Sequence, residues 1–246
     1  MPDFGPGMPP RVKAVLFDLG GTLVDYHDYA HWTELARRCF VDVQEEEMAH
    51  TFHEVERATD IRERVSYTEF WRQVLALASG RAVERATAER FVALVRETPG
   101  FNRLYSDSRR CLEELRAEGR RLGVVSNSSS EARCRAILHE TAILPFFDRV
   151  VSSGTEGVEK PDAEIFHRAV ARMGVRPEEA FYVGNLAFTD AEAAREAGLA
   201  SVWLNRGGTG MSDDPPEISS LLELPLWLRR LERPPVENPR AARRAA

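Results

Sequence analysis

A single carboxylate, Asp18, stands at the end of an apolar, strand-like segment that runs from Val12 to Phe17. Two glycines and a threonine follow it, at Gly20, Gly21 and Thr22. A strand that ends on a polar residue before a glycine turn is how an open α/β sheet presents a reactive group at its edge. A carboxylate in this place can attack phosphorus and hold the phosphoryl group covalently, which splits one difficult step into two. Position 20, where a second carboxylate would form an acid/base pair, holds glycine instead.

Other groups suited to phosphate chemistry follow along the chain. They bring hydroxyls, amides, a cation and a carboxylate, at Ser126, Asn127, Ser128, Lys160, Asn185 and Asp190. Hydroxyls, backbone amides and ammonium groups stabilise the negative charge that builds up on a phosphoryl group during transfer. Lys160 is conspicuous because it is one of two lysines in a chain whose other basic residues are arginines. Together with Asp18, the set indicates a phosphate-handling site.

Alternating strand and helix patterns explain how these groups would be positioned. Strands are expected at 11–17, 121–126, 149–152, 180–183 and 200–204. Helices are expected at 107–118, 129–140, 161–173, 189–197 and 218–231, the first of them capped by Ser106 or Asp107. Strands separated by helices predict right-handed crossovers and a parallel sheet. The carboxyl ends of such strands border one crevice, where Asp18, Ser126 and Asn185 would meet.

One long stretch interrupts this alternation. From about residue 27 to residue 98, apolar residues recur at helical spacing and no convincing strand is found. Helices are expected there at 29–40, 45–59, 67–77 and 86–96. The sequence therefore predicts an α/β core that holds an all-helical insertion between its first strand and the rest.

These motifs, in this order, resemble those of the haloacid dehalogenase-like (HAD) superfamily, and the resemblance extends from Arg11 to Leu231. The run Asp18-Leu19-Gly20-Gly21-Thr22 is similar to the first motif, D-x-D-x-T, and Ser126 and Lys160 to the second and third. The segment from Gly184 and Asn185 to Asp190 is similar to the fourth, G-D-x-x-x-x-D. The resemblance implies a Rossmann-like parallel sheet formed by residues 11–24 and 100–231, with a helical cap at 25–99. The tails at 1–10 and 232–246 are expected to be flexible.

The resemblance also implies a role for each motif residue. Asp18 would be the nucleophile, with Ser126 and Lys160 as its catalytic partners. Phosphate would be bound by Gly21, Thr22, Asn127 and Ser128. Magnesium would be held by Asp18, the Gly20 carbonyl, Asn185 and Asp190. For Asp190 two other roles stay open, as an acidic residue favoured at a helix N-terminus and as the group that orients Lys160.

Two departures from the family pattern affect the expected chemistry. Gly20 replaces the aspartate that in family phosphatases protonates the leaving group and then activates water. Asn185 replaces an aspartate that usually binds the metal directly. The Gly20 carbonyl and the Asn185 amide oxygen can still serve as ligands, but the site has lost one formal negative charge, so weaker magnesium binding and reduced activity are expected.

Residues at the start of the insertion carry a second interpretation. The aromatic and histidine group Tyr26, His27, Tyr29, His31 and Trp32 lines a substrate pocket on one reading and packs between helices on the other. Arg62 and Arg64 bind an anionic substrate on one reading and form a solvated helix face on the other. For each single residue, packing or solvation is the favoured reading.

Three functions fit these residues. The first is a magnesium-dependent phosphatase of a small phosphorylated metabolite. The second is a 2-haloacid dehalogenase, a branch that lacks the second aspartate and needs no metal, although it usually has an aromatic residue at position 20. The third is a binding or regulatory protein that retains the fold without activity. The presence of Asp18, Ser126, Lys160 and Asp190 favours a hydrolase.

The composition of the chain argues against several other classes of protein. The 246-residue chain carries a net charge of −6, which argues against binding nucleic acid through its phosphates. Its three cysteines are widely spaced, which suits a reduced, cytoplasmic protein better than a disulfide framework. No apolar run reaches the roughly 20 residues that span a bilayer. A small-molecule substrate and a monomer or homodimer are therefore expected.

Overall fold

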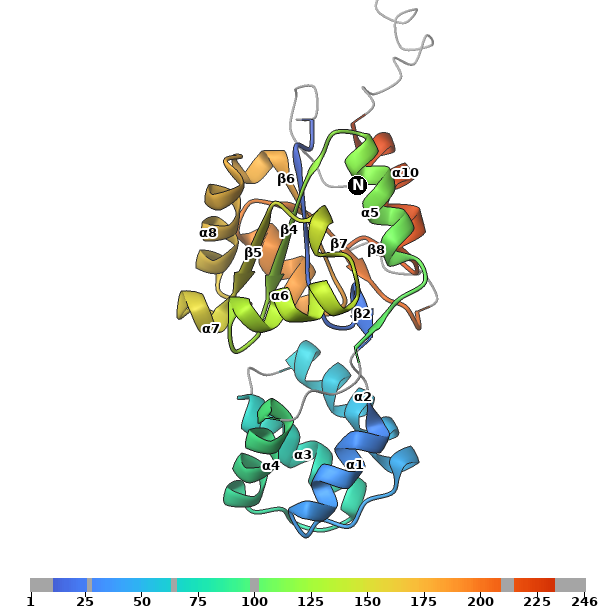
Figure 1. Ribbon diagram of the computed structural model, residues 1–246, viewed down its shortest axis with the longest axis vertical. Coiled ribbons are helices and arrows are strands. Elements are labelled where there is room, and N and C mark those ends of the chain that lie inside the picture. Colours follow the sequence, from blue (N-terminus) through green and yellow to red (C-terminus); the bar gives the residue numbers. More distant parts are fainter. Residues whose placement is uncertain (1–10, 26–27, 63–65, 98–101, 209–214, 233–246) are drawn as a thin grey trace, which may run out of the picture.

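The computed structural model describes residues 11–25, 28–62, 66–97, 102–208 and 215–232 (Figure 1). An α/β body forms one part of the molecule and four helices form the other, joined where the chain crosses between them. Among the described residues, none of the helices is both long and apolar enough to cross a membrane.

A six-stranded sheet forms the centre of the α/β body, and each of its neighbouring pairs is parallel. In spatial order the strands are β5 (Arg149–Ser152), β4 (Arg121–Ser126), β1 (Ala14–Phe17), β6 (Ala180–Gly184), β7 (Ala200–Leu204) and β8 (Glu217–Ile218). Because β1 lies between β4 and β6, the carboxyl ends of these three strands are adjacent. The expected parallel sheet is confirmed.

The two faces of β1 are buried under different helices. Val15 and Phe17 face the layer of α5 (Ser108–Ala117), α6 (Glu131–Glu140) and α10 (Leu224–Leu231). Ala14 and Leu16 face the layer of α8 (Ala163–Met173) and α9 (Ala193–Glu196). A strand covered on both faces has no polar side, which explains its unbroken apolar sequence. This double burial makes β1 a rigid support for the residue that follows it.

The helical insertion comprises α1 (Tyr29–Arg38), α2 (Glu45–Arg62), α3 (Tyr67–Ser79) and α4 (Arg85–Glu97). Its interior is aromatic: Trp71 is buried and its ring lies 4.8 Å from the rings of both Trp32 and Phe91. A short antiparallel pair, β2 (Val24–Asp25) and β3 (Arg103–Leu104), links the insertion to the core. The expected helical insertion is therefore confirmed, while the exact domain boundaries stay a prediction.

Three local expectations differ from the structure. Residues 218–231 are not one helix, because Glu217–Ile218 pairs with β7 and a short 3-10 turn, η4 (Leu221–Glu223), precedes α10. The helix expected from residue 189 starts two residues earlier, as a π-helical turn, η3 (Ala187–Glu192). Glu232, assigned to the flexible tail, accepts hydrogen bonds from the Val12 amide (2.8 Å) and from Arg120 (2.8 and 3.0 Å). Residues 1–10 and 233–246 lie outside the described part.

Candidate active site

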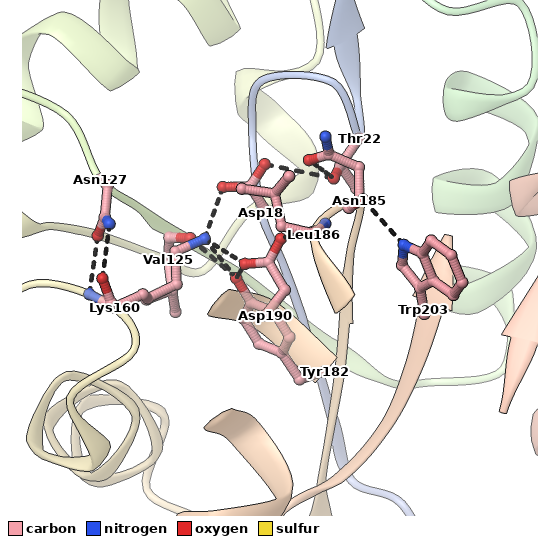
Figure 2. Close-up of polar contacts among 10 residues, drawn as sticks. All are labelled: Asp18, Thr22, Val125, Asn127, Lys160, Tyr182, Asn185, Leu186, Asp190 and Trp203. Atoms are coloured by element: carbon pink, nitrogen blue, oxygen red, sulfur yellow. Dashed lines mark hydrogen bonds and ion pairs between the residues drawn. The ribbon is translucent and has the colours of Figure 1, made fainter. Parts of the chain in front are cut away.

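Asp18 begins the turn after β1 and is nearly buried, with 7% of its surface exposed. Its amide donates to the Val183 carbonyl of the neighbouring strand at 2.9 Å. One carboxylate oxygen, Oδ1, accepts from Lys160 Nζ at 2.8 Å, and the other, Oδ2, accepts from Thr22 Oγ1 at 3.3 Å (Figure 2). The carboxylate is thus fixed in position from two sides, by a cation and by a hydroxyl.

The turn that follows Asp18 depends on Gly21. Gly21 has φ of 78°, in the left-handed region that favours glycine. Its amide donates to the Val24 carbonyl, and the amides of Leu23 and Val24 both donate to the Leu19 carbonyl. This tight turn brings the Thr22 side chain back toward Asp18, so Gly21 supports the position of Asp18 through backbone geometry.

Lys160 lies in the middle of a buried cluster of polar groups. Its Nζ atom donates to Asp18 Oδ1, to Asp190 Oδ1 at 2.5 Å and to the Tyr182 hydroxyl at 2.9 Å. Its backbone is held as well, because the Asn127 side chain donates to the Lys160 carbonyl and accepts from the Lys160 amide, both at 2.9 Å. The Asn127 side chain, expected to bind phosphate, is therefore committed to fixing Lys160.

Asp190 is fully buried, and donors engage both of its carboxylate oxygens. Oδ1 accepts from Lys160 and lies 3.0 Å from the Tyr182 hydroxyl, while Oδ2 accepts from the Leu186 amide at 3.0 Å. Gly184 leaves room for this arrangement, since a Cβ there would lie 2.2 Å from Asp190 Cγ. Of the roles considered for Asp190, the contacts favour orienting Lys160 over binding a metal.

Tyr182 is a site residue that the sequence analysis missed. It lies on β6, fully buried, and its hydroxyl contacts Lys160 Nζ, Asp190 Oδ1 and, at 3.2 Å, the Val125 carbonyl. Burial and the two nearby carboxylates raise the pKa of Tyr182 well above its usual range, so the hydroxyl keeps its proton and donates it. A tyrosine inside a buried strand needs a polar partner, and that was the available signal.

Burial and neighbouring charges set the ionisation of Asp18 and Lys160. Burial, with a contribution from Asp190, raises the pKa of Asp18 to about 6, although the attraction of Lys160 acts in the opposite direction. For Lys160, burial lowers the pKa, but Asp18 and Asp190 outweigh it, and the pKa lies above its ordinary value. Near neutral pH the site therefore contains the Asp18 carboxylate beside the Lys160 ammonium group.

The second motif lies at the end of β4, next to Asp18. The pairing of β1 with β4 sets Phe17 opposite Val124, so Ser126 lies one residue beyond the position opposite Asp18. The loop beyond Ser126 is tied to the short helix α7 (Ser153–Glu156) that follows β5, because the Ser128 carbonyl accepts from the Gly154 amide at 2.9 Å. The expected hydroxyls therefore reach the same edge of the sheet as Asp18.

The side chain of Asn185 completes the edge of the site beside the Asp18 turn. Its Oδ1 atom accepts from Thr22 Oγ1 at 3.3 Å, and its backbone carbonyl accepts from Trp203 Nε1 at 2.9 Å (Figure 2). Among the residues that the structure describes, no three His, Cys, Asp or Glu side chains group together as a metal centre. One carboxylate, from Asp18, and neutral oxygens from Asn185 and Gly20 remain, a set that fits Mg²⁺ only with retained waters.

The insertion residues singled out in the sequence lie in different places. Trp32 is buried in the insertion, and its ring lies 5.5 Å from that of Tyr29. These two residues serve helix packing, the favoured reading. His31 has a buried Nε2 atom that finds no hydrogen-bond partner among the described residues. Tyr26, His27 and Arg64, and the side chain of Arg62, lie outside the described part.

Comparison with known proteins agrees with this geometry. The family model described as "haloacid dehalogenase-like hydrolase" matches residues 12–198. The chain belongs to the haloacid dehalogenase-like hydrolases. It is 30% identical over 244 residues to N-acylneuraminate-9-phosphatase of Rattus norvegicus, covering 90% of this chain and 96% of the relative. It is 32% identical over 206 residues to glyceraldehyde 3-phosphate phosphatase of Methanopyrus kandleri, covering 80% and 85%.

A solved structure of this hydrolase family has a similar fold. The HAD-hydrolase YfnB from Bacillus subtilis, whose structure is bound to magnesium, superposes with a TM-score of 0.67 at 20% identity. The match covers 89% of this chain and 99% of that one. The two curated relatives named above are phosphatases by name, one of an N-acylneuraminate 9-phosphate and one of glyceraldehyde 3-phosphate.

Proposed function

We propose that this chain is a phosphatase of a small phosphorylated metabolite and works through an aspartyl-phosphate on Asp18. The observation that carries the proposal is the contact of Lys160 Nζ with Asp18 Oδ1, at 2.8 Å, in a buried site. Both curated relatives named above carry phosphatase names, which supports the same reaction class.

The reaction has two balanced steps. In the first, an Asp18 oxygen forms a bond to phosphorus while the bond from phosphorus to the substrate oxygen breaks, and the leaving group departs with that electron pair. In the second, water attacks phosphorus, the Asp18–phosphate bond breaks with its electron pair returning to the Asp18 carboxylate, and the released inorganic phosphate carries the protons of the water. Lys160 lies beside Asp18 throughout and stabilises charge on the transferred oxygens, while Asp190 and Tyr182 keep its ammonium group in place.

A magnesium ion is part of the proposal. Asp18, the Gly20 carbonyl and the Asn185 amide oxygen would hold Mg²⁺, which when bound neutralises charge on the phosphoryl oxygens. Asp190 is left out of this set because its side chain is fully buried around Lys160, whereas Asp18 keeps some exposed surface at the edge of the site. With a single carboxylate ligand, the ion is expected to bind weakly and to rely on the phosphate of the substrate for further oxygens.

Gly20 restricts the proposed substrates. Position 20 supplies no proton to the departing oxygen, so the leaving group departs as an anion or takes a proton from elsewhere in the substrate or from an acid of the helical insertion. Anomeric sugar phosphates and acyl phosphates meet this requirement better than simple alkyl phosphates, because their leaving groups are more stable as anions. The substrate class we propose is therefore a metabolite with an activated phosphate.

A screen of phosphorylated metabolites tests the proposal. Phosphate release is measured with and without Mg²⁺, with the Asp18→Asn variant as the control. We expect release that depends on Asp18 and is fastest with activated phosphates. Release of halide from short 2-haloacids, unaffected by chelator, would instead support the dehalogenase alternative. Absence of both activities, together with failure of beryllium fluoride to bind at Asp18, would support a catalytically silent protein.

A further inference from the structure

We propose that Arg206 and Asp107 form a clamp with two roles. It positions the turn formed by residues 18–24, which we call the nucleophile turn, and it anchors the two segments by which the chain enters and leaves the helical insertion. Arg206 follows β7, and Asp107 directly precedes α5. Neither residue belongs to the four motifs.

The first half of the clamp is the contact of Arg206 with the nucleophile turn. Arg206 Nη2 donates to the Thr22 carbonyl at 2.6 Å, and Nε lies 3.4 Å from the Gly21 carbonyl. Thr22 is fully buried, and its hydroxyl is the group that contacts Asp18 Oδ2 and Asn185 Oδ1, both at 3.3 Å. By holding the backbone of Thr22, Arg206 fixes the hydroxyl that holds the nucleophile.

The second half is a two-pronged ion pair with the returning chain. Arg206 Nη1 donates to Asp107 Oδ2 at 2.9 Å and Nη2 donates to Asp107 Oδ1 at 3.0 Å. The guanidinium also stacks on the Tyr105 ring, with 3.9 Å from its central carbon to the ring centre. Bidentate pairing and stacking fix both the position and the plane of an arginine.

Asp107 is itself held in a fixed position. It stands at the N-cap position of α5, where the sequence predicts Ser106 or Asp107 as the capping residue, but its side chain makes no capping bond. Instead Oδ2 accepts from the Ser220 hydroxyl and from the Leu221 amide, both at 2.9 Å. Burial raises the pKa of Asp107, but the hydrogen bonds and the charge of Arg206 outweigh this, and the pKa is lowered. The clamp therefore rests on an ionised, nearly buried carboxylate.

The clamp lies where the chain enters and leaves the insertion. The Leu23 carbonyl accepts from the Tyr105 amide at 3.2 Å and from the Ser108 hydroxyl at 2.8 Å. Immediately beyond, Val24 and Asp25 pair with Leu104 and Arg103. Arg206 therefore holds the outgoing and the returning segments on the core side of the two-stranded link. Any movement of the insertion would have to pivot beyond this point, leaving the Asp18 turn undisturbed.

Arg120 provides a control for Arg206, because it is an arginine with the same kinds of partner, although it is more deeply buried. It donates to both oxygens of Glu232 and, through Nη1, to the Val12 carbonyl at 2.8 Å. It precedes β4, at the opposite end of the sheet from Asp18. Its loss should lower stability in a similar way without affecting the site.

The test compares Arg206→Gln with Arg120→Gln in the full chain, well below the unfolding temperature of either variant. The expected change in kcat rests on the proposed phosphatase function, because kcat is measured as phosphate release. Because misplacement of a reacting group by about 1 Å can cost 100-fold, Arg206→Gln is expected to lower kcat about 10- to 100-fold with little change in KM. Arg120→Gln is expected to keep kcat within about twofold, since the geometry required by the chemistry is intact.

Hydrogen exchange gives a readout that does not require activity. Arg206→Gln should increase exchange at the amides of Leu23 and Val24, which donate to Leu19, while Arg120→Gln should leave them unchanged. Equal exchange in the two variants, or unchanged kcat in Arg206→Gln, would overturn the clamp. If the wild-type chain releases no phosphate from any substrate, the proposed function fails, and the exchange comparison still decides whether the clamp exists.

Discussion

The side chain of Asn185 lies against Gly21 so closely that a Cβ on Gly21 would come within 2.5 Å of Asn185 Nδ2. The amide also accepts a hydrogen bond from Thr22, which in turn contacts Asp18. Asn185 is therefore packed into the nucleophile turn, and an isosteric aspartate can occupy the same space. This makes it practical to restore separately each of the two carboxylates that the site lacks.

Asn185→Asp is expected to tighten magnesium binding. The change adds a negative charge beside Asp18 without altering size, and the Thr22 hydroxyl can donate to the new carboxylate as it does to the amide. We expect the Mg²⁺ concentration that gives half-maximal activity to fall about tenfold, because a second charged ligand strengthens a hard-cation site. Magnesium titration of phosphate release measures this. The same or a higher half-maximal concentration in the variant would show that Asn185 does not lie at the metal.

Gly20→Asp is expected to extend activity to unactivated substrates. Unlike Gly21, Gly20 does not have a left-handed backbone, so its backbone conformation is one that other residues can adopt. An acid there can protonate the departing oxygen, which we expect to raise kcat/KM for alkyl phosphates about tenfold or more and to change the rate for activated phosphates little. The Gly20→Asn variant, equal in size but unable to give a proton, is the control. Equal gains in both variants would assign the effect to packing.

On the acid side of the pH profile, the decrease in kcat/KM should follow the protonation of Asp18. Its pKa is raised to about 6, and the attacking carboxylate must be ionised, so kcat/KM should decrease as the pH falls through about 6. A rate that stays constant down to pH 4 would argue against Asp18 as the titrating nucleophile.

Asp18→Asn should stabilise the protein while abolishing turnover. A carboxyl whose pKa is higher in the folded state destabilises that state once it is ionised, so the penalty is absent below pH 4 and complete above pH 6. The variant removes this penalty, and its free energy of unfolding at pH 7 should rise by up to about 3 kcal/mol. Denaturant unfolding at pH 4 and pH 7 checks the sign, since the gain must shrink at the lower pH. A variant less stable than the wild type at pH 7 would contradict the prediction.

Tyr182→Phe should separate support of Lys160 from catalysis. The variant removes one hydroxyl from a buried network and leaves the Val125 carbonyl without that contact. We expect the free energy of unfolding to fall by about 1–3 kcal/mol, because buried polar groups lose a hydrogen-bond partner. The contacts of Lys160 with Asp18 and Asp190 remain, so kcat should decrease less than tenfold. A much larger loss of kcat at unchanged stability would place the hydroxyl in the chemistry.

Much of the fold and site follows from local sequence. The strands 121–126, 149–152 and 200–204 were predicted to the residue, because short apolar runs bounded by polar turns specify buried parallel strands. The order of Asp18, Ser126, Lys160 and Asn185 along the chain indicated one shared edge, since the carboxyl ends of neighbouring parallel strands meet there.

The parts that were missed depend on distant partners. β8 contains two residues and forms only because β7 offers an open edge. The role of Arg206 could not be predicted from the sequence, because its partner Asp107 lies 99 positions away and arginines are frequent in this chain. The commitment of Asn127 to Lys160 likewise arises across 33 positions. Sequence spacing showed which groups meet, but side-chain pairing determined which role each one takes.

The hydrogen bond from the Val12 amide to Glu232 joins the two ends of the described core at the edge of the sheet opposite Asp18. The first and last described residues of the core therefore lie close together in space. A short peptide linking these ends, with new termini opened in an exposed loop, should yield a circularly permuted protein whose site is unaltered.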